Sequence, residues 1–258
     1  MIRFASLGSG SKGNATLIES GAANSDTRIL LDCGFSTKEI ELRLAVHGRT
    51  ADSLTAIVIT HEHSDHVSGA GRLSRKYNIP VWLTAGTYYS SKDNEFSEIH
   101  FVDSHADFSI EDIELLPFPV PHDAREPCQF VFSDGNTRLG IVTDLGCHTP
   151  HILKHLNNLD ALLLECNYDQ SMLVNGVYPQ RLKERVLGIK GHLDNSQSSE
   201  LLKRLNLPQL KHIIGMHVSE KNNTSALAVD ALCVGLNCGK DDVALASQND
   251  GFAWRELR

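Results

Sequence analysis

The stretch Thr60-His61-Glu62-His63-Ser64-Asp65-His66 directly follows the apolar run from Thr55 to Ile59. That β-branched run predicts a buried strand, so the polar cluster lies where the strand ends and a loop begins at the edge of a sheet. Imidazole and carboxylate groups this close together are typical of a metal site. The intervals between the histidines are two, three and five residues, which excludes the zincin helix, whose two histidines lie four residues apart on one face.

The side chains of this cluster divide into two pairs. His61 and His63 are two residues apart, so we expect them to face the same side of the chain. Asp65 and His66 lie further on, where small and apolar residues predict a helix, and they can face a second centre. We therefore expect two adjacent divalent metal ions. The alternative is a solvated polar loop in which the imidazoles only form hydrogen bonds.

Other predicted strands also end in polar residues. His122 follows the apolar strand from Leu115 to Val120, which is the placement that His61 has. His217 opens a polar segment directly after the predicted strand from Lys211 to Met216. These positions extend the candidate site to the second half of the chain.

Two aspartates close strands as well. Asp32 ends the strand from Arg28 to Leu31, where it could orient a metal-bound histidine through a hydrogen bond. Asp144 follows the strand from Thr137 to Thr143, the second strand of a hairpin whose turn is Asp134-Gly135-Asn136. We interpret Asp144 as a carboxylate that bridges two metals, with capping of the next helix as the alternative.

A glycine-rich loop from Gly8 to Asn14 separates the first two predicted strands. It does not end in Gly-Lys-Ser/Thr and a strand follows it, so it is not a P-loop. Its polar side chains are expected to line the site, because functional groups often lie on such loops. With three later asparagines, the candidate substrate-binding residues are Ser11, Lys12, Asn14, Asn167, Asn195 and Asn222.

The net charge of the chain is acidic, 24 − 32 = −8. This charge argues against a protein that holds nucleic acid through a global basic field. The window from Arg181 to Lys190 is locally basic, with Glu184 as its single acid. We expect it either to grip a phosphate backbone or to be a solvated helix face.

The 258 residues are expected to form a single domain, 1–258, because no linker, charge block or repeat divides them. Six cysteines form no CxxC pair, and the first residues lack the apolar core of a signal peptide. No apolar run is long enough to cross a membrane. We therefore expect a cytoplasmic protein without membrane contact whose cysteines are buried thiols.

The order HxHxDH, a later His, a later Asp and a final His resembles the metallo-β-lactamase superfamily over essentially the whole chain. Further motifs are similar to its YycJ/WalJ branch. They are Ser9-Gly10-Ser11-Lys12-Gly13-Asn14, Pro121-His122-Asp123-Ala124, Thr143-Asp144-Leu145-Gly146, Gly191-His192-Leu193-Asp194-Asn195 and His217-Val218-Ser219-Glu220-Lys221-Asn222-Asn223. Two positions depart from the branch, since Tyr168 stands where a histidine is expected and Asp194 where a serine is expected.

The resemblance implies an α/β fold, the αββα four-layer sandwich, with a dinuclear site at one edge. The implied ligands are His61, His63 and His122 for one metal, Asp65, His66 and His217 for the other, and Asp144 between them. Zn²⁺, Mn²⁺ and Fe²⁺ all accept this nitrogen and oxygen set.

The implied activity is hydrolysis of a phosphodiester by a metal-bridging hydroxide, in a nuclease with exonuclease character on DNA. Two divalent ions outweigh two carboxylates, which favours an anionic substrate. Asp65 would orient the nucleophile and His192 would protonate the leaving group as general acid. The alternatives are hydrolysis of a small ester, thioester, lactone or cyclic phosphate, a redox role with iron, and a scaffold without catalysis.

Overall fold

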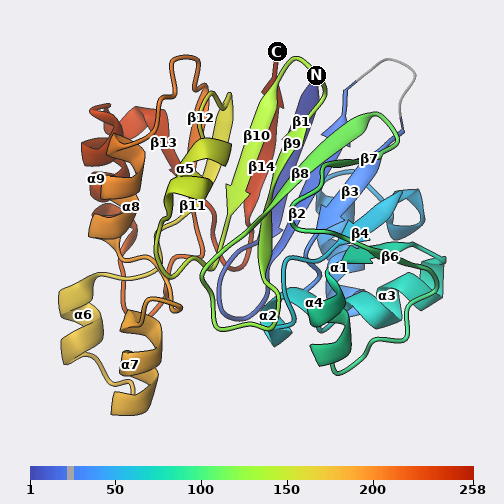
Figure 1. The fold of residues 1–258 in the computed structure, drawn as a ribbon, viewed down its shortest axis with the longest axis horizontal. Helices are drawn as coiled ribbons and strands as arrows, with labels where there is room; N and C mark the ends of the chain where they lie inside the picture. The colour runs from blue at the N-terminus through green and yellow to red at the C-terminus, as the bar shows by residue number, and fades with distance from the viewer. Residues whose placement is uncertain (22–25) are drawn as a thin grey trace.

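The computed structural model describes residues 1–21 and 26–258 (Figure 1). Within these residues the strands form two seven-stranded sheets. The first sheet has the order β14 (Phe252–Leu257), β1 (Ile2–Gly8), β2 (Ala15–Ser20), β3 (Arg28–Leu31), β4 (Ala56–Val58), β5 (Val81–Leu83) and β6 (Ile99–Phe101). The second has the order β13 (Val243–Leu245), β12 (His212–Met216), β11 (Ala161–Glu165), β10 (Arg138–Val142), β9 (Cys128–Ser133), β8 (Ile113–Pro119) and β7 (Phe108–Ile110).

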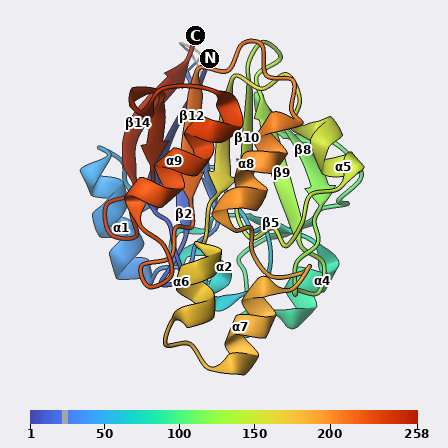
Figure 2. The ribbon, with the colours of Figure 1, turned by 90° about the vertical axis from the view of Figure 1, so that its left-hand side faces the viewer.

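Helices cover the outer faces of both sheets, as Figures 1 and 2 show. On the first sheet lie α1, α3 and α4, and on the second lie α5, α8 and α9. The helices of the described residues are α1 (Thr37–Val46), α2 (Ser64–Val67), α3 (Ala70–Tyr77), α4 (Ala85–Ser90), α5 (Pro150–His155), α6 (Gln170–Asn175), α7 (Gln180–Leu187), α8 (Asn195–Lys203) and α9 (Ser225–Leu236), with short 3₁₀ turns at Ala51–Ser53 and Lys240–Asp242.

Three apolar clusters hold these layers together. The first lies between the sheets, where Phe4 and Ile29 of one sheet meet Phe130 and Phe132 of the other. The second packs helices such as α1 on the outer face of the first sheet, and the third does the same for the second sheet. The order helix, sheet, sheet, helix confirms the predicted αββα sandwich.

Each sheet is antiparallel on one side and parallel on the other. Strands β3 to β6 run parallel in the first sheet, and β10 to β13 run parallel in the second. The carboxyl ends of parallel strands meet at the same edge, where polar residues from distant parts of the chain can converge.

The backbone turns sharply where three of these strands end. Asp32, Asp144 and His217 follow β3, β10 and β12 and have φ of 60°, 56° and 53°. This left-handed region is uncommon for residues other than glycine, and aspartate tolerates it better than most. All three turns lead into the candidate site.

The six cysteines are free thiols, but only Cys33, Cys128 and Cys166 are buried. Cys147, Cys233 and Cys238 are partly exposed, so the prediction of six buried thiols is wrong for these three. Among the described residues, no helix combines the length and apolar character that a membrane span requires.

Candidate metal centre

Three histidines from two loops form the first group of possible ligands. His61 Nε2 lies 3.1 Å from His63 Nδ1, which lies 3.1 Å from His122 Nε2. His122 Nδ1 donates to the carbonyl oxygen of Gly191 at 3.0 Å, so a neutral ring directs the Nε2 lone pair into the group. Three ring nitrogens that converge in this way suit a divalent transition metal.

A second group joins Asp65, His66 and His217. His66 Nδ1 lies 2.7 Å from Asp32 Oδ2, which leaves Nε2 facing two other carboxylates. That nitrogen is 2.9 Å from Asp144 Oδ2 and 3.4 Å from Asp65 Oδ2. Asp32 is thus placed where it could orient His66, and its carboxylate is itself held because it accepts from the Thr60 backbone at 2.9 Å.

Asp144 lies between the two groups. Its Oδ2 faces His66, while its Oδ1 lies 3.4 Å from His217 Nδ1 and 3.9 Å from His122 Nε2. Among the described residues, Asp144 Oδ2 and His217 Nε2 are buried atoms without a hydrogen-bond partner of good geometry. Buried atoms of this kind need a counterpart, and a divalent cation fits both the donor set and their position.

The carboxylates of this centre are held in their charged form. Burial raises the pKa of Asp65 and of Asp144, but His66 and His217 outweigh burial and lower both pKa values. Burial lowers the pKa of His217, yet Asp144, Asp65 and Glu165 raise it to about 10. The pKa of His66 is raised in the same way, chiefly by Asp144. Protons on these histidines therefore compete with a cation for the same site.

Glu165 belongs to the site, although the sequence analysis did not assign it. It is the last residue of β11 and fully buried, and its Oε1 lies 2.7 Å from His192 Nδ1 and 3.2 Å from His217 Nδ1. Its Oε2 accepts from the backbone of Leu145 and Leu193 at 2.8 and 3.0 Å. The available signal was a carboxylate directly after a buried apolar strand, which is the pattern that singled out Asp144.

His192 lies beside both metal-ligand groups. Its ring centroid is 5.4 Å from that of His122 and 5.3 Å from that of His217. Burial lowers the pKa of His192, but Glu165 and Asp144 outweigh burial and raise it. With Nδ1 bonded to Glu165, Nε2 is the nitrogen that remains to act in the cavity that His192 lines.

A cavity of about 320 Å³ opens over these residues. Of the candidate substrate-binding residues, Ser11, Asn167 and Asn222 line it. Lys12 is exposed and forms an ion pair with Glu220 at 2.6 Å.

Two candidate substrate-binding residues have other contacts. Asn14 lies against the ligands themselves, with Nδ2 3.3 Å from Asp65 Oδ2 and 3.1 Å from His66 Nε2. Asn195 is buried, bonds to Asn223 at 3.0 Å and is not among the residues that line the cavity. The bond to Asn223 gives the Asn195 amide a structural role that does not require a substrate.

Tyr168 and Asp194, the two residues that depart from the expected pattern, both make structural contacts within the fold. Tyr168 is buried and forms a β-bridge with Asp194. Asp194 caps α8, where its side chain accepts from the Gln197 backbone and the Gln197 side chain accepts from the Asp194 backbone. Neither residue lines the cavity.

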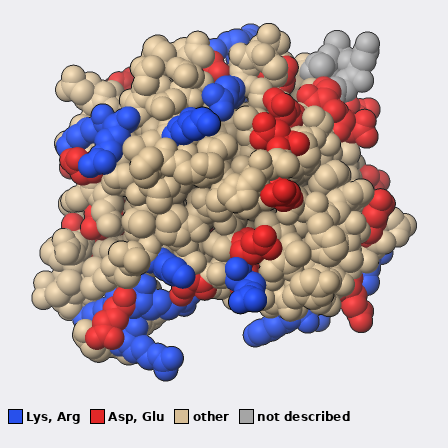
Figure 3. Space-filling view, viewed as in Figure 1, with Lys and Arg blue, Asp and Glu red and all other residues tan. Residues whose placement is uncertain are grey.

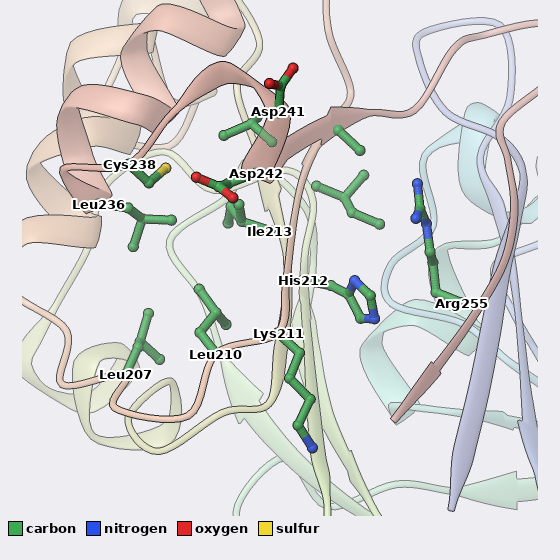
Figure 4. A pocket seen from close by; sticks show the side chains of 13 residues that line it. Leu207, Leu210, Lys211, His212, Ile213, Leu236, Cys238, Asp241, Asp242 and Arg255 are labelled. Atoms are coloured by element: carbon green, nitrogen blue, oxygen red, sulfur yellow. The ribbon is translucent and has the colours of Figure 1, made fainter. Parts of the chain in front are cut away.

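A second cavity of about 500 Å³ lies at the amino ends of β12 and β13 (Figure 4). His212 and Arg255 line one side of it, and Asp241 and Asp242 line the other. Among the described residues, no group of possible metal ligands falls in this cavity. The chemistry is concentrated at the opposite ends of these strands.

Comparison with known proteins agrees with this architecture. A family model described as a beta-lactamase superfamily domain matches residues 27–218. Exodeoxyribonuclease WalJ of Streptococcus pneumoniae is 33% identical over 232 residues, which cover 88% of this chain and 85% of that protein. Exodeoxyribonuclease YycJ of Bacillus anthracis is 32% identical over 231 residues, which cover 88% of this chain and 86% of that protein.

The fold has counterparts among solved structures. The metallo-beta-lactamase fold protein YhfI from Bacillus subtilis superimposes with a TM-score of 0.74 over 99% of each chain, at 14% sequence identity. This likeness concerns the fold. Together with the family match, it confirms the resemblance inferred from the sequence motifs.

Proposed function

This chain belongs to the β-lactamase superfamily, and from that premise we propose that it is a metal-dependent phosphodiesterase that degrades DNA as an exonuclease. The observation that carries the proposal is the convergence of two ligand groups on Asp144, with the Glu165–His192 pair beside them. The names of the two curated relatives support the choice of DNA as substrate.

The centre would hold two divalent ions. The first would be bound by His61, His63 and His122 and the second by Asp65, His66 and His217, with Asp144 shared between them. When bound, such ions polarise a phosphoryl oxygen and make water a nucleophile near neutral pH. Zinc or manganese, with iron as a further choice, suits this mixture of imidazole and carboxylate donors.

The other residues of the site would move protons. The Asp65 carboxylate lines the cavity and would orient the attacking water as a hydrogen-bond acceptor. Glu165 accepts from His192 Nδ1, which fixes the ring so that Nε2 carries a proton toward the leaving group. Breaking the P–O bond creates an alkoxide, and His192 would donate the proton that it needs.

An acidic protein needs local positive charge to hold a nucleic acid. Figure 3 shows Lys and Arg gathered at the lower left, over α6 and α7. The basic window lies on α7 and just after it, and it contains Arg181, Lys183, Arg185 and Lys190. This surface adjoins the cavity, because Arg185 also lines it.

The test is the variant His192→Ala, assayed on a DNA oligonucleotide and on an activated ester. We expect DNA hydrolysis to fall by about 10²- to 10⁴-fold, because an alkoxide leaving group needs the general acid. Metal content should stay at the wild-type level, and His105→Ala, at an exposed position, should leave both activities unchanged. Ester hydrolysis should persist in His192→Ala, because acyl hydrolysis does not need this acid, and DNA hydrolysis that persists as well would favour an acyl hydrolase instead.

Metal identity is tested separately. Untreated protein is analysed for metals, then stripped and reloaded with Zn²⁺, Mn²⁺ or Fe²⁺ before assay on single- and double-stranded oligonucleotides. We expect close to two ions per chain and no activity after stripping. One ion per chain in the most active preparation would contradict a dinuclear centre.

A further inference from the structure

The segment between β11 and α8 projects from the sandwich beside the metal centre. It carries α6 and α7, which lie below the two sheets in Figures 1 and 2. A small apolar cluster holds it together, with Tyr168, Leu173 and Val186 buried and Tyr178 and Leu182 packed against them. Backbone bonds tie its ends to the site, since Asp169 N donates to Asn222 O at 2.8 Å.

The inner face of this segment is one wall of the cavity. Tyr178, Leu182 and Val186 bring an aromatic ring and two aliphatic side chains to that wall. The polar wall of the cavity consists of Ser11, Asn167, Ser219 and Asn222. Metal-assisted hydrolysis of a bare phosphodiester needs no apolar wall, whereas a nucleoside has a flat apolar base and a polar sugar and matches both walls.

Arg185 is fixed at the mouth of the same cavity. Its guanidinium forms two bonds to the Asp123 carboxylate, from Nε at 2.5 Å and from Nη2 at 3.2 Å. Asp123 directly follows the possible ligand His122, so this pairing sets the guanidinium beside the metal centre. The Arg185 side chain remains 50% exposed, which leaves part of its donor fork available to a phosphate.

A second cation flanks the aromatic ring. Lys221 Nζ lies 5.7 Å from the centre of the Tyr178 ring. Lys221 belongs to the loop that supplies Ser219 and Asn222 to the polar wall. An aromatic ring with one cation near it and a second cation, Arg185, in the same cavity lining suits a base and its phosphates.

We propose that Tyr178 is a stacking platform for a base of the substrate strand and that Arg185 binds a phosphate next to the scissile one. This inference rests on the proposed function and adds the residues that recognise the nucleotide. A cavity of about 320 Å³ is at the lower end of the range for small-molecule sites. It therefore suits one nucleotide of a single strand and is too small for a base pair.

The experiment compares matched variants on two substrates. One substrate is a single-stranded oligonucleotide, and the other is an abasic oligonucleotide of the same length, which keeps the sugar–phosphate chain and has no bases. Tyr178→Leu is paired with Tyr178→Phe, which keeps the ring. Arg185→Gln is paired with Arg204→Gln at the end of α8, because Arg204 is exposed, lies outside the basic window and does not line the cavity.

We expect Tyr178→Leu to lower kcat/KM on the oligonucleotide by about 5- to 150-fold, mainly through KM, since stacking is lost. Its activity on the abasic oligonucleotide should stay within about 2-fold of the wild type, because that substrate has no base to stack. Arg185→Gln should weaken oligonucleotide binding and reduce the slope of log K against log salt by about 1. Tyr178→Phe and Arg204→Gln should behave as the wild type does.

Equal losses on both substrates for Tyr178→Leu would overturn the inference, because the ring would then only shape the metal site. Unchanged oligonucleotide kinetics in Tyr178→Leu and Arg185→Gln would overturn it as well. Anisotropy of a fluorescent oligonucleotide tests binding without turnover and should show the same order of variants. If the wild type hydrolyses neither substrate but binding separates the variants, the proposed function fails while the recognition wall stands.

Discussion

Glu165 connects the two functions of the centre, ligand orientation and proton transfer. Its carboxylate accepts from the backbone of Leu145 and Leu193 with one oxygen and faces His192 and His217 with the other. Burial raises the pKa of Glu165, but His192 and His217 outweigh burial and lower it to about 2. The group is therefore a permanent acceptor at neutral pH, which an amide of the same shape cannot replace.

The variant Glu165→Gln tests this role. The glutamine NH₂ group must point either at the backbone N–H groups of Leu145 and Leu193 or at the ring nitrogens of His192 and His217. In either case the groups that it faces lose their acceptor. We expect kcat on DNA to fall by about 10²-fold or more. Because Glu165 raises the pKa of His192, the pH above which activity falls should move downward.

That pH profile separates positioning from simple structural damage. Metal content and thermal unfolding are measured in parallel, and Glu126→Gln, an exposed acid, is the control. If activity rises and falls at the same pH values as in the wild type and only the maximal activity is lower, the role assigned to Glu165 is contradicted.

At the residue scale, the sequence pattern predicts metal ligands where polar groups follow apolar strands, and the structure brings these side chains together. Glu165 shares that pattern but lies in no spaced motif, so its contacts became visible only when β11 was placed beside β10 and β12. The prediction that Asn195 binds substrate rests on a polar motif, in which an asparagine can equally bond to another buried asparagine, here Asn223.

Among the elements, backbone hydrogen bonds join three segments beside the predicted ligands Asp65 and His66. Asn14 N donates to Asp65 O at 2.7 Å, Gly34 N donates to Asn14 O at 3.0 Å, and Cys33 N donates to His66 O at 2.7 Å. The glycine loop, the end of β3 and α2 therefore position Asp65 and His66 together. The backbones of Gly34 and Asp65 can approach this closely only because Gly34 has no side chain. A Cβ at Gly34 would lie 1.8 Å from Asp65 O.

The variant Gly34→Ala should disturb this junction. We expect a loss of about 1–3 kcal/mol in the free energy of unfolding and weaker metal binding, because Asp65 and His66 must shift. Gly239→Ala is the control, since the nearest atom to its Cβ would be Asp242 Oδ2 at 3.4 Å. Denaturant unfolding and metal titration give both quantities, and a Gly34→Ala protein with wild-type metal affinity would contradict this account of the junction.

Elements with a strong local signal were predictable. The turn Asp134-Gly135-Asn136 does join β9 and β10, and most of the basic window from Arg181 to Lys190 lies on α7. The short elements α4, α6 and β7 were not predicted. They contain six, six and three residues, too few for a hydrophobic period, and their placement depends on contacts such as the small cluster around Tyr168.

At the scale of the whole molecule, the buried charges of the centre make stability depend on pH. In the metal-free protein His217 has a pKa of about 10 against an ordinary 6.5. Its contribution is fully present below pH 6.5 and is lost as pH rises toward 10. Glu165, with a pKa of about 2 against 4.5, contributes above pH 4.5 and loses its contribution as pH falls toward 2.

We therefore expect the metal-free protein to be most stable between pH 4.5 and 6.5 and to lose several degrees in Tm by pH 9, since each kcal/mol corresponds to roughly 2–4 °C. Added metal should raise Tm more at pH 9 than at pH 6, because it binds the deprotonated histidines. Thermal unfolding with and without chelator measures both. A metal-free Tm that rises from pH 6.5 to pH 9 would contradict the assignment.

At Asp32, Asp144 and His217 the backbone adopts a left-handed conformation that costs most residues about 1–2 kcal/mol, whereas glycine adopts it freely. Glycine would relieve this strain, but it would also remove buried side chains on which neighbours depend, as Thr60 and His66 depend on Asp32. The chain thus tolerates backbone strain at three strand ends in return for the side chains that these turns carry into the candidate metal centre.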